Sequence, residues 1–364
     1  MATNIDLPEK VIIIGGVPRS GKTMLSNALG SHSQIAIPPS AFNFFYWFSE
    51  EKFESRGGFE ENLDFFFRSC WKSEAWNLTR EMVLESGYDR RDLYLILLEG
   101  YRRAYFPKKK YVGEYTHVIE EHFDTLVDWF GLKRLKFIHP IRNPFDNYAS
   151  YVVARKVPNT ARKPKTYDAF VHKFCHMWGQ STTMGLYRAL KYPNSYRVVF
   201  FNEFKDDPVG SVQSLCEWLG VPAEPGRMLN MVDAIKKKQN SAFEVESVQE
   251  EGVGFVKKDN YDRLRHLSEY EVAAIRAMSC PDLLHAMGYE RHDVIVNWKR
   301  PKSIDAGEYS LKFQLMAKSY LSSLPFRQVV GITLRYIVEA FKDVLFVVLR
   351  QSLRKSLWWR SKRT

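Results

Sequence analysis

The sequence of 364 residues predicts an α/β fold, a parallel β-sheet flanked by helices on both faces. Short apolar segments alternate along the chain with longer amphipathic ones, as strands alternate with helices in such folds. The first apolar segment, residues 11–14 (VIII), contains only β-branched residues, which is typical of a strand buried on both faces of a parallel sheet. A glycine-rich loop and a helical pattern follow it, so the first unit is strand, loop and helix.

The glycine-rich loop, residues 15–23 (GGVPRSGKT), predicts a binding site for a phosphate or sulfate group. Unpaired N–H groups and the positive end of the helix dipole meet at such a loop, and Arg19 and Lys22 add full charges. From Gly16 to Thr23 the loop also matches the P-loop pattern G-x-x-x-x-G-K-[ST]. We therefore expect a P-loop-like fold, with a tight turn that binds nothing as the alternative.

Four further strands are predicted, over residues 34–37, 111–114, 135–141 and 197–201, with helical periodicity between them. Ligands of open α/β sheets bind at the carboxyl ends of the strands, where Glu114, His117 and Arg142 are expected to lie. Helix starts are predicted at Pro144, with Asn143 as cap, and at Pro208. The aromatic run FNFFYWF at residues 42–48 is interpreted as core packing, with an apolar wall for an acceptor as the alternative.

Positive charge is concentrated near the C-terminus. The net charge is +11, and residues 321–364 carry nine lysines and arginines against two acidic residues. The expected partner of this tail is therefore an anionic membrane surface, through an amphipathic helix over residues 325–364, and not nucleic acid. The alternative is a helix that packs on the catalytic domain or on a second subunit of an oligomer. We divide the chain into a domain of residues 1–295 and a C-terminal helical extension of residues 296–364.

The expected location is cytoplasmic, with peripheral association on the inner face of a membrane. The N-terminal residues MATNIDLPEK lack the apolar core of a signal peptide, and charges interrupt every long apolar stretch. The four cysteines form no C-x-x-C pair, so the sequence predicts no zinc site.

Two separated motifs resemble those of the sulfotransferase family. GGVPRSGKT is similar to the family's phosphosulfate-binding P-[KR]-S-G-T-T, and RNPFDNYASY, from residue 142, is similar to R-[DN]-P-x-D-x-x-x-S. VGEYTH and FFNEFKDDP fall where the family often has W-G-[DE]-K-T-P and R-Y-E-D-L-x-x-D-P. The resemblance spans roughly residues 10–290.

This resemblance implies sulfuryl transfer from 3′-phosphoadenosine 5′-phosphosulfate (PAPS) to a hydroxyl of a carbohydrate, glycolipid or lipid-like acceptor, without a metal. Arg142 and Ser150 would bind the 3′-phosphate, and Arg19 and Lys22 would also stabilise the charge that grows on the leaving oxygen. The loop would bind the 5′-phosphosulfate through Gly16, Pro18, Arg19, Ser20, Gly21, Lys22 and Thr23.

The chain departs from the family pattern at several positions. Lys22 replaces the first threonine of the loop, Tyr115 replaces a lysine, and Ser40 stands near the place where related enzymes often carry a glutamate base. The general base is therefore expected to be either His117 or Glu114. The C-terminal donor-binding loop is matched only loosely, and its expected cations are Lys257, Lys258 and Arg263.

Two other functions fit parts of the sequence. The GKT ending of the loop also suits a P-loop kinase or NTPase acting on ATP, which needs an acidic magnesium ligand at the end of a neighbouring strand. The strand over residues 135–141 ends instead in His139 and Pro140, followed by Arg142. The third candidate is a membrane-associated scaffold with a degenerate nucleotide pocket.

Overall fold

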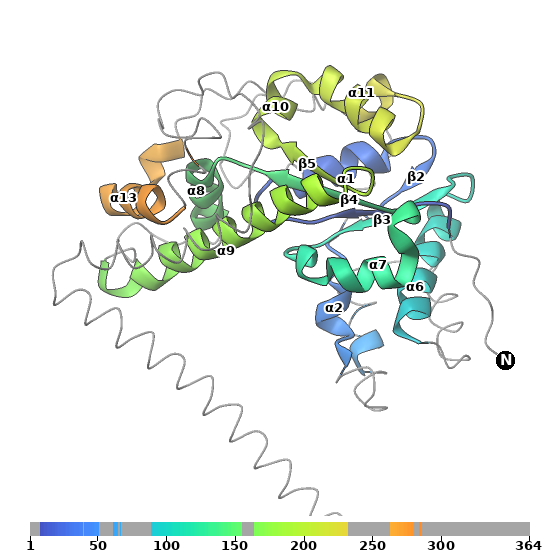
Figure 1. Cartoon of the computed structure of the whole chain (residues 1–364), viewed down its shortest axis with the longest axis horizontal. Coiled ribbons are helices and arrows are strands. Elements are labelled where there is room, and N and C mark those ends of the chain that lie inside the picture. The colour runs from blue at the N-terminus through green and yellow to red at the C-terminus, as the bar shows by residue number, and fades with distance from the viewer. Residues whose placement is uncertain are drawn as a thin grey trace, which may run out of the picture.

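A five-stranded parallel sheet forms the centre of the protein (Figure 1). The computed structural model describes residues 8–38, 40–50, 61–64, 66, 89–154, 164–231, 263–279 and 284. The strand order is β2-β3-β1-β4-β5. The strands are β1 (Val11–Ile14), β2 (Ile35–Ala36), β3 (Tyr111–Tyr115), β4 (Leu135–Ile141) and β5 (Tyr196–Phe200).

The register of the three central strands brings their carboxyl ends together. Ile14, the last residue of β1, lies opposite Tyr115 of β3 and Ile138 of β4. The loop after β1 therefore lies between the segment that follows β3 and the last three residues of β4. This is the edge at which open α/β sheets bind ligands.

Helices cover both faces of the sheet, as the sequence predicts. In Figure 1, α11 lies on one side of the sheet and α6 and α7 lie on the other. The helices near the first face are α1 (Lys22–Gly30), α10 (Phe201–Asp206), α11 (Pro208–Leu219) and α12 (Pro225–Leu229); those of the second face are α6 (Arg90–Tyr105) and α7 (Phe123–Arg134). The other helices within the described residues are α2 (Phe44–Trp47), η1 (Ile119–His122), α8 (Pro144–Ala154), α9 (Pro164–Lys191), η3 (Arg263–His266) and α13 (Glu269–Met278).

The alternation of side chains along β1 explains the two layers of core. Val11 and Ile13 pack in one apolar cluster with α6 and α7, whereas Ile12 and Ile14 pack in another with α1 and α11. All four residues are fully buried, which explains the absence of polar positions in this strand.

The aromatic run at residues 42–48 is mainly core, which confirms the favoured interpretation. Phe42, Phe44 and Phe48 are fully buried; Phe42 and Phe44 pack against Tyr94 of α6, and Phe48 packs against Phe44. Only Tyr46 is largely exposed, at 67%.

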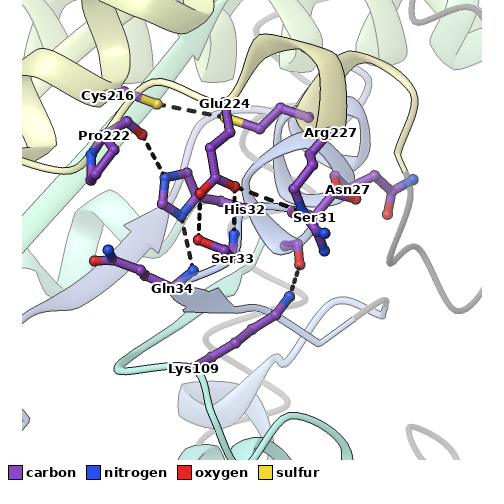
Figure 2. A network of polar contacts seen from close by, with 12 residues as sticks. Asn27, Ser31, His32, Ser33, Gln34, Lys109, Cys216, Pro222, Glu224 and Arg227 are labelled. Atoms are coloured by element: carbon purple, nitrogen blue, oxygen red, sulfur yellow. Dashed lines mark hydrogen bonds and ion pairs between the residues drawn. The ribbon is translucent and has the colours of Figure 1, made fainter.

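A polar network holds α1 and α12 together at the end of α1 remote from the loop (Figure 2). The His32 ring contacts the Pro222 carbonyl through Nε2 at 2.8 Å and accepts the Gln34 N–H at Nδ1 at 3.0 Å. The Glu224 carboxylate accepts the Ser33 N–H at 2.8 Å. The His32 and Glu224 contacts join segments about 190 residues apart in the sequence, and Arg227 of α12 donates to the Ser31 carbonyl oxygen at 3.2 Å.

The element boundaries differ from the sequence prediction in a few places. The second strand has only two residues, and the fifth begins at Tyr196 and ends at Phe200, because Phe201 already begins α10. The helical pattern after His117 divides into a 3-10 turn and α7. Within the described ranges, none of the helices is both long and apolar enough to cross a bilayer. Residues 296–364 and the boundary at residue 295 lie outside the described residues.

Candidate functional site

The loop between β1 and α1 turns on three residues with left-handed backbone conformations. Gly16, Arg19 and Gly21 have φ values of 93°, 67° and 105°. A Cβ on Gly16 would lie 3.0 Å from the Pro140 carbonyl oxygen, and one on Gly21 would lie 2.4 Å from the Phe201 ring. Glycine is therefore needed at both positions for close packing as well as for the turn.

Arg19 is the exception, because a non-glycine residue rarely adopts a positive φ. This backbone conformation directs the loop toward α8 and the end of β4. Arg19 Nε donates to Ser150 Oγ at 3.1 Å, and Arg142 donates to the Arg19 carbonyl oxygen at 3.1 Å. The structure thus brings together Arg19, Arg142 and Ser150, three residues that the sequence analysis selected from separate motifs.

Phe201, at the start of α10, supports this cluster from below. The Arg142 guanidinium lies 4.6 Å from the centre of the Phe201 ring, and the same ring fills the space beside Gly21. Cation–π contact of this kind is favourable and also fixes the plane of the guanidinium. The sequence predicts Phe201 at the end of a strand, and no pattern in it indicates a role in the site.

Lys22 lies inside the loop, with only 3% of its surface exposed. Its Nζ donates to the carbonyl oxygens of Gly16 and Val17, each at 2.5 Å. Burial, with a smaller contribution from Arg19, lowers the pKa of Lys22 to about 7, although the charge of Glu120 acts in the opposite direction. The protonation state of this side chain therefore changes near neutral pH.

His117 lies beyond β3, next to the loop. Its neighbour Val118 has a φ of 59°, an uncommon conformation for a β-branched residue, and donates its N–H to the Gly16 carbonyl oxygen at 3.2 Å. Protein atoms crowd around the His117 ring although it keeps access to solvent. This desolvation, together with the charges of Lys22 and Arg19, lowers the pKa of His117 to about 3, so the ring is neutral at pH 7.

Glu114, in contrast, is fully buried beneath the site. Its carboxylate accepts hydrogen bonds from the Tyr94 hydroxyl at 2.6 Å and from the Thr116 hydroxyl at 2.7 Å. Burial raises the pKa of Glu114 to about 7 despite these two donors. The side chain therefore contacts α6 and Thr116, whereas His117 lies beside the cations of the loop.

Three buried polar side chains around the loop have no hydrogen-bond partner within the described part of the chain. They are the Ser20 hydroxyl, both polar atoms of the Asn147 amide, and the Asn202 amide nitrogen. Ser20 belongs to the loop, Asn147 to the helix that carries Ser150, and Asn202 to the helix that begins with Phe201. Leaving buried polar groups unpaired costs free energy, so their concentration here fits a site for a polar, anionic ligand.

A buried carboxylate, Glu120, also belongs to the site, and the sequence analysis did not identify it. Glu120 accepts the N–H of Gly16 at 2.8 Å from beneath the loop. It lies in η1, in a stretch that reads as an ordinary charged helix, so no sequence pattern indicates its burial. Of the expected C-terminal cations, Lys257 and Lys258 lie outside the described residues, and Arg263 begins η3, which packs against α8.

The described residues also contain no cluster of three or more histidine, cysteine, aspartate or glutamate side chains arranged to hold a metal ion.

Fold and loop together define an α/β protein with a P-loop-like turn between β1 and α1 at the edge of a parallel sheet. The model of the sulfotransferase family matches residues 11–225, more than half of the chain and all of these site residues apart from η3. The chain belongs to the sulfotransferase family. This membership favours sulfuryl transfer over the kinase interpretation of the GKT ending.

Several solved structures resemble the chain at low sequence identity. The sulfotransferase domain of the Synechococcus PCC 7002 olefin synthase is 15% identical, with a TM-score of 0.46, and the match covers 89% of this chain and 99% of that domain. A mouse sulfotransferase complexed with PAP (adenosine 3′,5′-bisphosphate) is 14% identical, with a TM-score of 0.39. The match covers 74% of this chain and 82% of that protein. No functionally curated protein matches the sequence.

Glu114 predicts a specific pH dependence of stability. Its pKa is about 7 in the folded protein against 4.5 for an ordinary glutamate, so the folded state binds more protons between these values. The stabilisation that protonated Glu114 gives the folded state is fully present below about pH 4.5 and is lost as the pH rises toward 7. We expect Glu114→Gln, which stays neutral, to gain stability relative to wild type between pH 5 and pH 8, by about 1.4 kcal/mol per unit of pKa difference.

Urea unfolding at both pH values measures this effect, with Glu121→Gln at an exposed position as the control. A difference between Glu114→Gln and wild type that is the same at pH 5 and pH 8 would contradict the assignment.

Proposed function

We propose that the protein transfers a sulfuryl group from PAPS to a hydroxyl acceptor. The observation that carries this proposal is the contact of the loop with Arg142 and Ser150, through the 3.1 Å bonds to Arg19. A nucleotide with a phosphosulfate at 5′ and a phosphate at 3′ needs two neighbouring anion sites on one edge of the sheet. Guanidinium groups bind phosphate through paired, charge-assisted hydrogen bonds, and a serine hydroxyl adds a further donor.

The residues of the loop fit the 5′ end of this donor. Its amide groups, the buried Ser20 hydroxyl and the side chains of Lys22 and Thr23 surround the start of α1, where an anion is stabilised by the helix dipole. We assign the 5′-phosphosulfate to residues 16–23, and the 3′-phosphate to Arg142 and Ser150. In this structure the Gly16 N–H is already bonded to Glu120, so we expect Gly16 to shape the loop mainly through its backbone conformation.

When bound, the donor supplies the sulfuryl group that passes to the acceptor oxygen while the bridging oxygen leaves with the nucleotide. Arg19 and Lys22 place positive charge beside that leaving oxygen, which stabilises the charge that develops there. The hydrogen bonds that fix Lys22 to the loop carbonyls reduce the reorganisation that this step requires.

The acceptor hydroxyl must lose a proton, and the geometry favours His117 as the base. Its ring is neutral at pH 7, reaches solvent and lies beside Lys22 and Arg19. Glu114 has a pKa of about 7, suitable for a base, but both its oxygens accept hydrogen bonds inside the core. For Glu114 to act it would have to exchange these partners for the acceptor.

The acceptor is proposed to be a hydroxyl on a carbohydrate, glycolipid or lipid-like molecule. This proposal rests on the basic tail, which would hold the protein peripherally on the cytoplasmic face of an anionic membrane. A lipid-linked hydroxyl would then be delivered to the site from that surface.

Exchange of Arg142 tests the donor. We expect Arg142→Gln to weaken binding of adenosine 3′,5′-bisphosphate (PAP) by about 10- to 100-fold, because a hydrogen bond to a charged group contributes roughly 1.5–3 kcal/mol. Binding of adenosine 5′-phosphate, which lacks the 3′ group, should change less than threefold. Isothermal titration calorimetry measures both affinities, with the exposed Arg134→Gln as control. Equal losses for the two nucleotides would show that Arg142 does not read the 3′-phosphate.

Single exchanges of His117 and Glu114 to glutamine identify the base. Removal of a general base typically lowers turnover by about 10²- to 10⁴-fold, and we expect this for His117→Gln with PAP affinity unchanged within twofold. Transfer is measured with ³⁵S-labelled PAPS and the acceptor that it labels in total lipid or polysaccharide extracts. If turnover survives both exchanges nearly intact, neither residue is the base.

The membrane proposal is tested on the full chain by replacing tail cations with glutamine, at Arg354, Lys355, Arg360, Lys362 and Arg363. We expect loss of co-sedimentation with phosphatidylserine-containing vesicles, because each basic residue near such a surface contributes about 1 kcal/mol. Wild type should also dissociate at 1 M salt, where charges are screened beyond about 3 Å. Sedimentation that the exchanges leave unchanged argues for a packed helix instead.

A further inference from the structure

A hydrogen-bond network of buried polar groups lies directly beneath the loop. Glu120 follows β3 in η1 and is completely buried. One carboxylate oxygen accepts the Gly16 N–H at 2.8 Å, and the other accepts the hydroxyl of Ser181 on α9. Glu120 thereby connects the first turn of the loop to α9, the longest helix within the described residues.

The hydrogen-bond network continues through His139 to β5. Ser181 Oγ lies 3.2 Å from His139 Nε2, and His139 Nδ1 lies 2.6 Å from the Tyr196 hydroxyl. Because Ser181 donates its single proton to Glu120, it accepts from Nε2–H of His139, which leaves Nδ1 to accept from Tyr196. Hydrogen-bond donation therefore runs in one direction, from Tyr196 to Glu120, and ends on a carboxylate.

The environment of this hydrogen-bond network favours a neutral His139 and an ionised Glu120. Burial lowers the pKa of His139 to about 4, so its ring is neutral at pH 7. Burial also opposes ionisation of Glu120, but hydrogen bonds from Ser181 and the Gly16 amide favour its charged form, and the pKa of Glu120 lies below its ordinary value. Glu120 is therefore a buried anion at neutral pH.

Lys22 holds the same glycine from the opposite side. Its Nζ donates to the Gly16 carbonyl oxygen, while Glu120 accepts the Gly16 N–H. A buried anion and a buried cation thus contact the N–H and the carbonyl oxygen of one residue, Gly16. Lys22 occupies the position of the first threonine in the family motif P-[KR]-S-G-T-T. A buried ammonium without an anion nearby loses its proton or destabilises the fold.

We propose that Glu120 is a positioning residue of the donor site, the buried counter-ion that keeps Lys22 charged within the loop. This inference rests on the proposed function, since the charge of Lys22 matters there for binding an anionic donor. It assigns Glu120 no direct contact with the donor.

The test replaces Glu120 by glutamine and measures PAP affinity by calorimetry between pH 6 and pH 9. Without the carboxylate the pKa of Lys22 falls, so we expect the pH above which affinity declines to move down by about one unit, and affinity at pH 8 to fall about tenfold. Glu121→Gln is the matched control, because it makes the same substitution at the neighbouring, exposed residue. It should change affinity less than twofold at every pH.

A double-mutant cycle with Lys22→Thr separates positioning from general structural support. If Glu120 acts through Lys22, Glu120→Gln has little further effect on PAP affinity or thermal unfolding once Lys22 is threonine. An equal effect in both backgrounds, or a pH profile that does not move, overturns the proposal. Should Glu120→Gln alone not fold, recovery of cooperative unfolding in the double variant supports the pair, and failure to recover contradicts it.

The two proposals fail in different ways. If the wild-type protein binds no PAP, the donor assignment is wrong, whereas the coupling in thermal unfolding still reports whether Glu120 and Lys22 form a pair. If PAP binds but the cycle is additive, only the role of Glu120 is wrong.

Discussion

The conformation of Gly16 is the constraint on which the rest of the site depends. With a φ of 93° and the Pro140 carbonyl close to its Cα, this residue makes the chain leave β1 sharply. Glu120, Lys22 and Val118 all bond to its peptide groups. The turn thereby fixes the start of the loop relative to η1, to α1 and to the segment that carries His117. A loop held at this point needs little reorganisation to receive an anion.

The positive charges of the site lie close to one buried anion, Glu120. Arg19, Arg142 and Lys22 converge within a small volume, and their mutual repulsion is relieved when an anionic ligand binds. The effect is visible in the lowered pKa values of Lys22 and His117. When an anionic donor binds as proposed, its negative charge offsets those cations and raises the pKa of His117 from its low value.

Much of this arrangement could be predicted from the sequence because it follows from local rules. The apolar run of β1, the glycine positions and the helix start at Pro144 are local signals, and parallel strands bring Arg142 and the loop to one edge. The short extent of β2 and the early start of α10 were missed, since residues at strand ends depend on neighbours in the sheet.

The polar network under the loop could not be predicted. Glu120, Ser181 and Tyr196 come from three elements, and each position is compatible with an ordinary surface or core residue in its own segment. Their meeting depends on how α9 crosses the sheet, and pairings over such separations leave no periodic signal in one sequence. The same holds for Phe201, whose role depends on the packing of α10 against Gly21.

A crystal structure of the protein with PAP shows whether two anion sites at one sheet edge bind a single adenine nucleotide. We expect the 5′-phosphate within residues 16–23 and the 3′-phosphate in contact with both Arg142 and Ser150. A nucleotide bound with its ribose turned away from these two side chains, or with its phosphates outside the loop, would contradict this expectation.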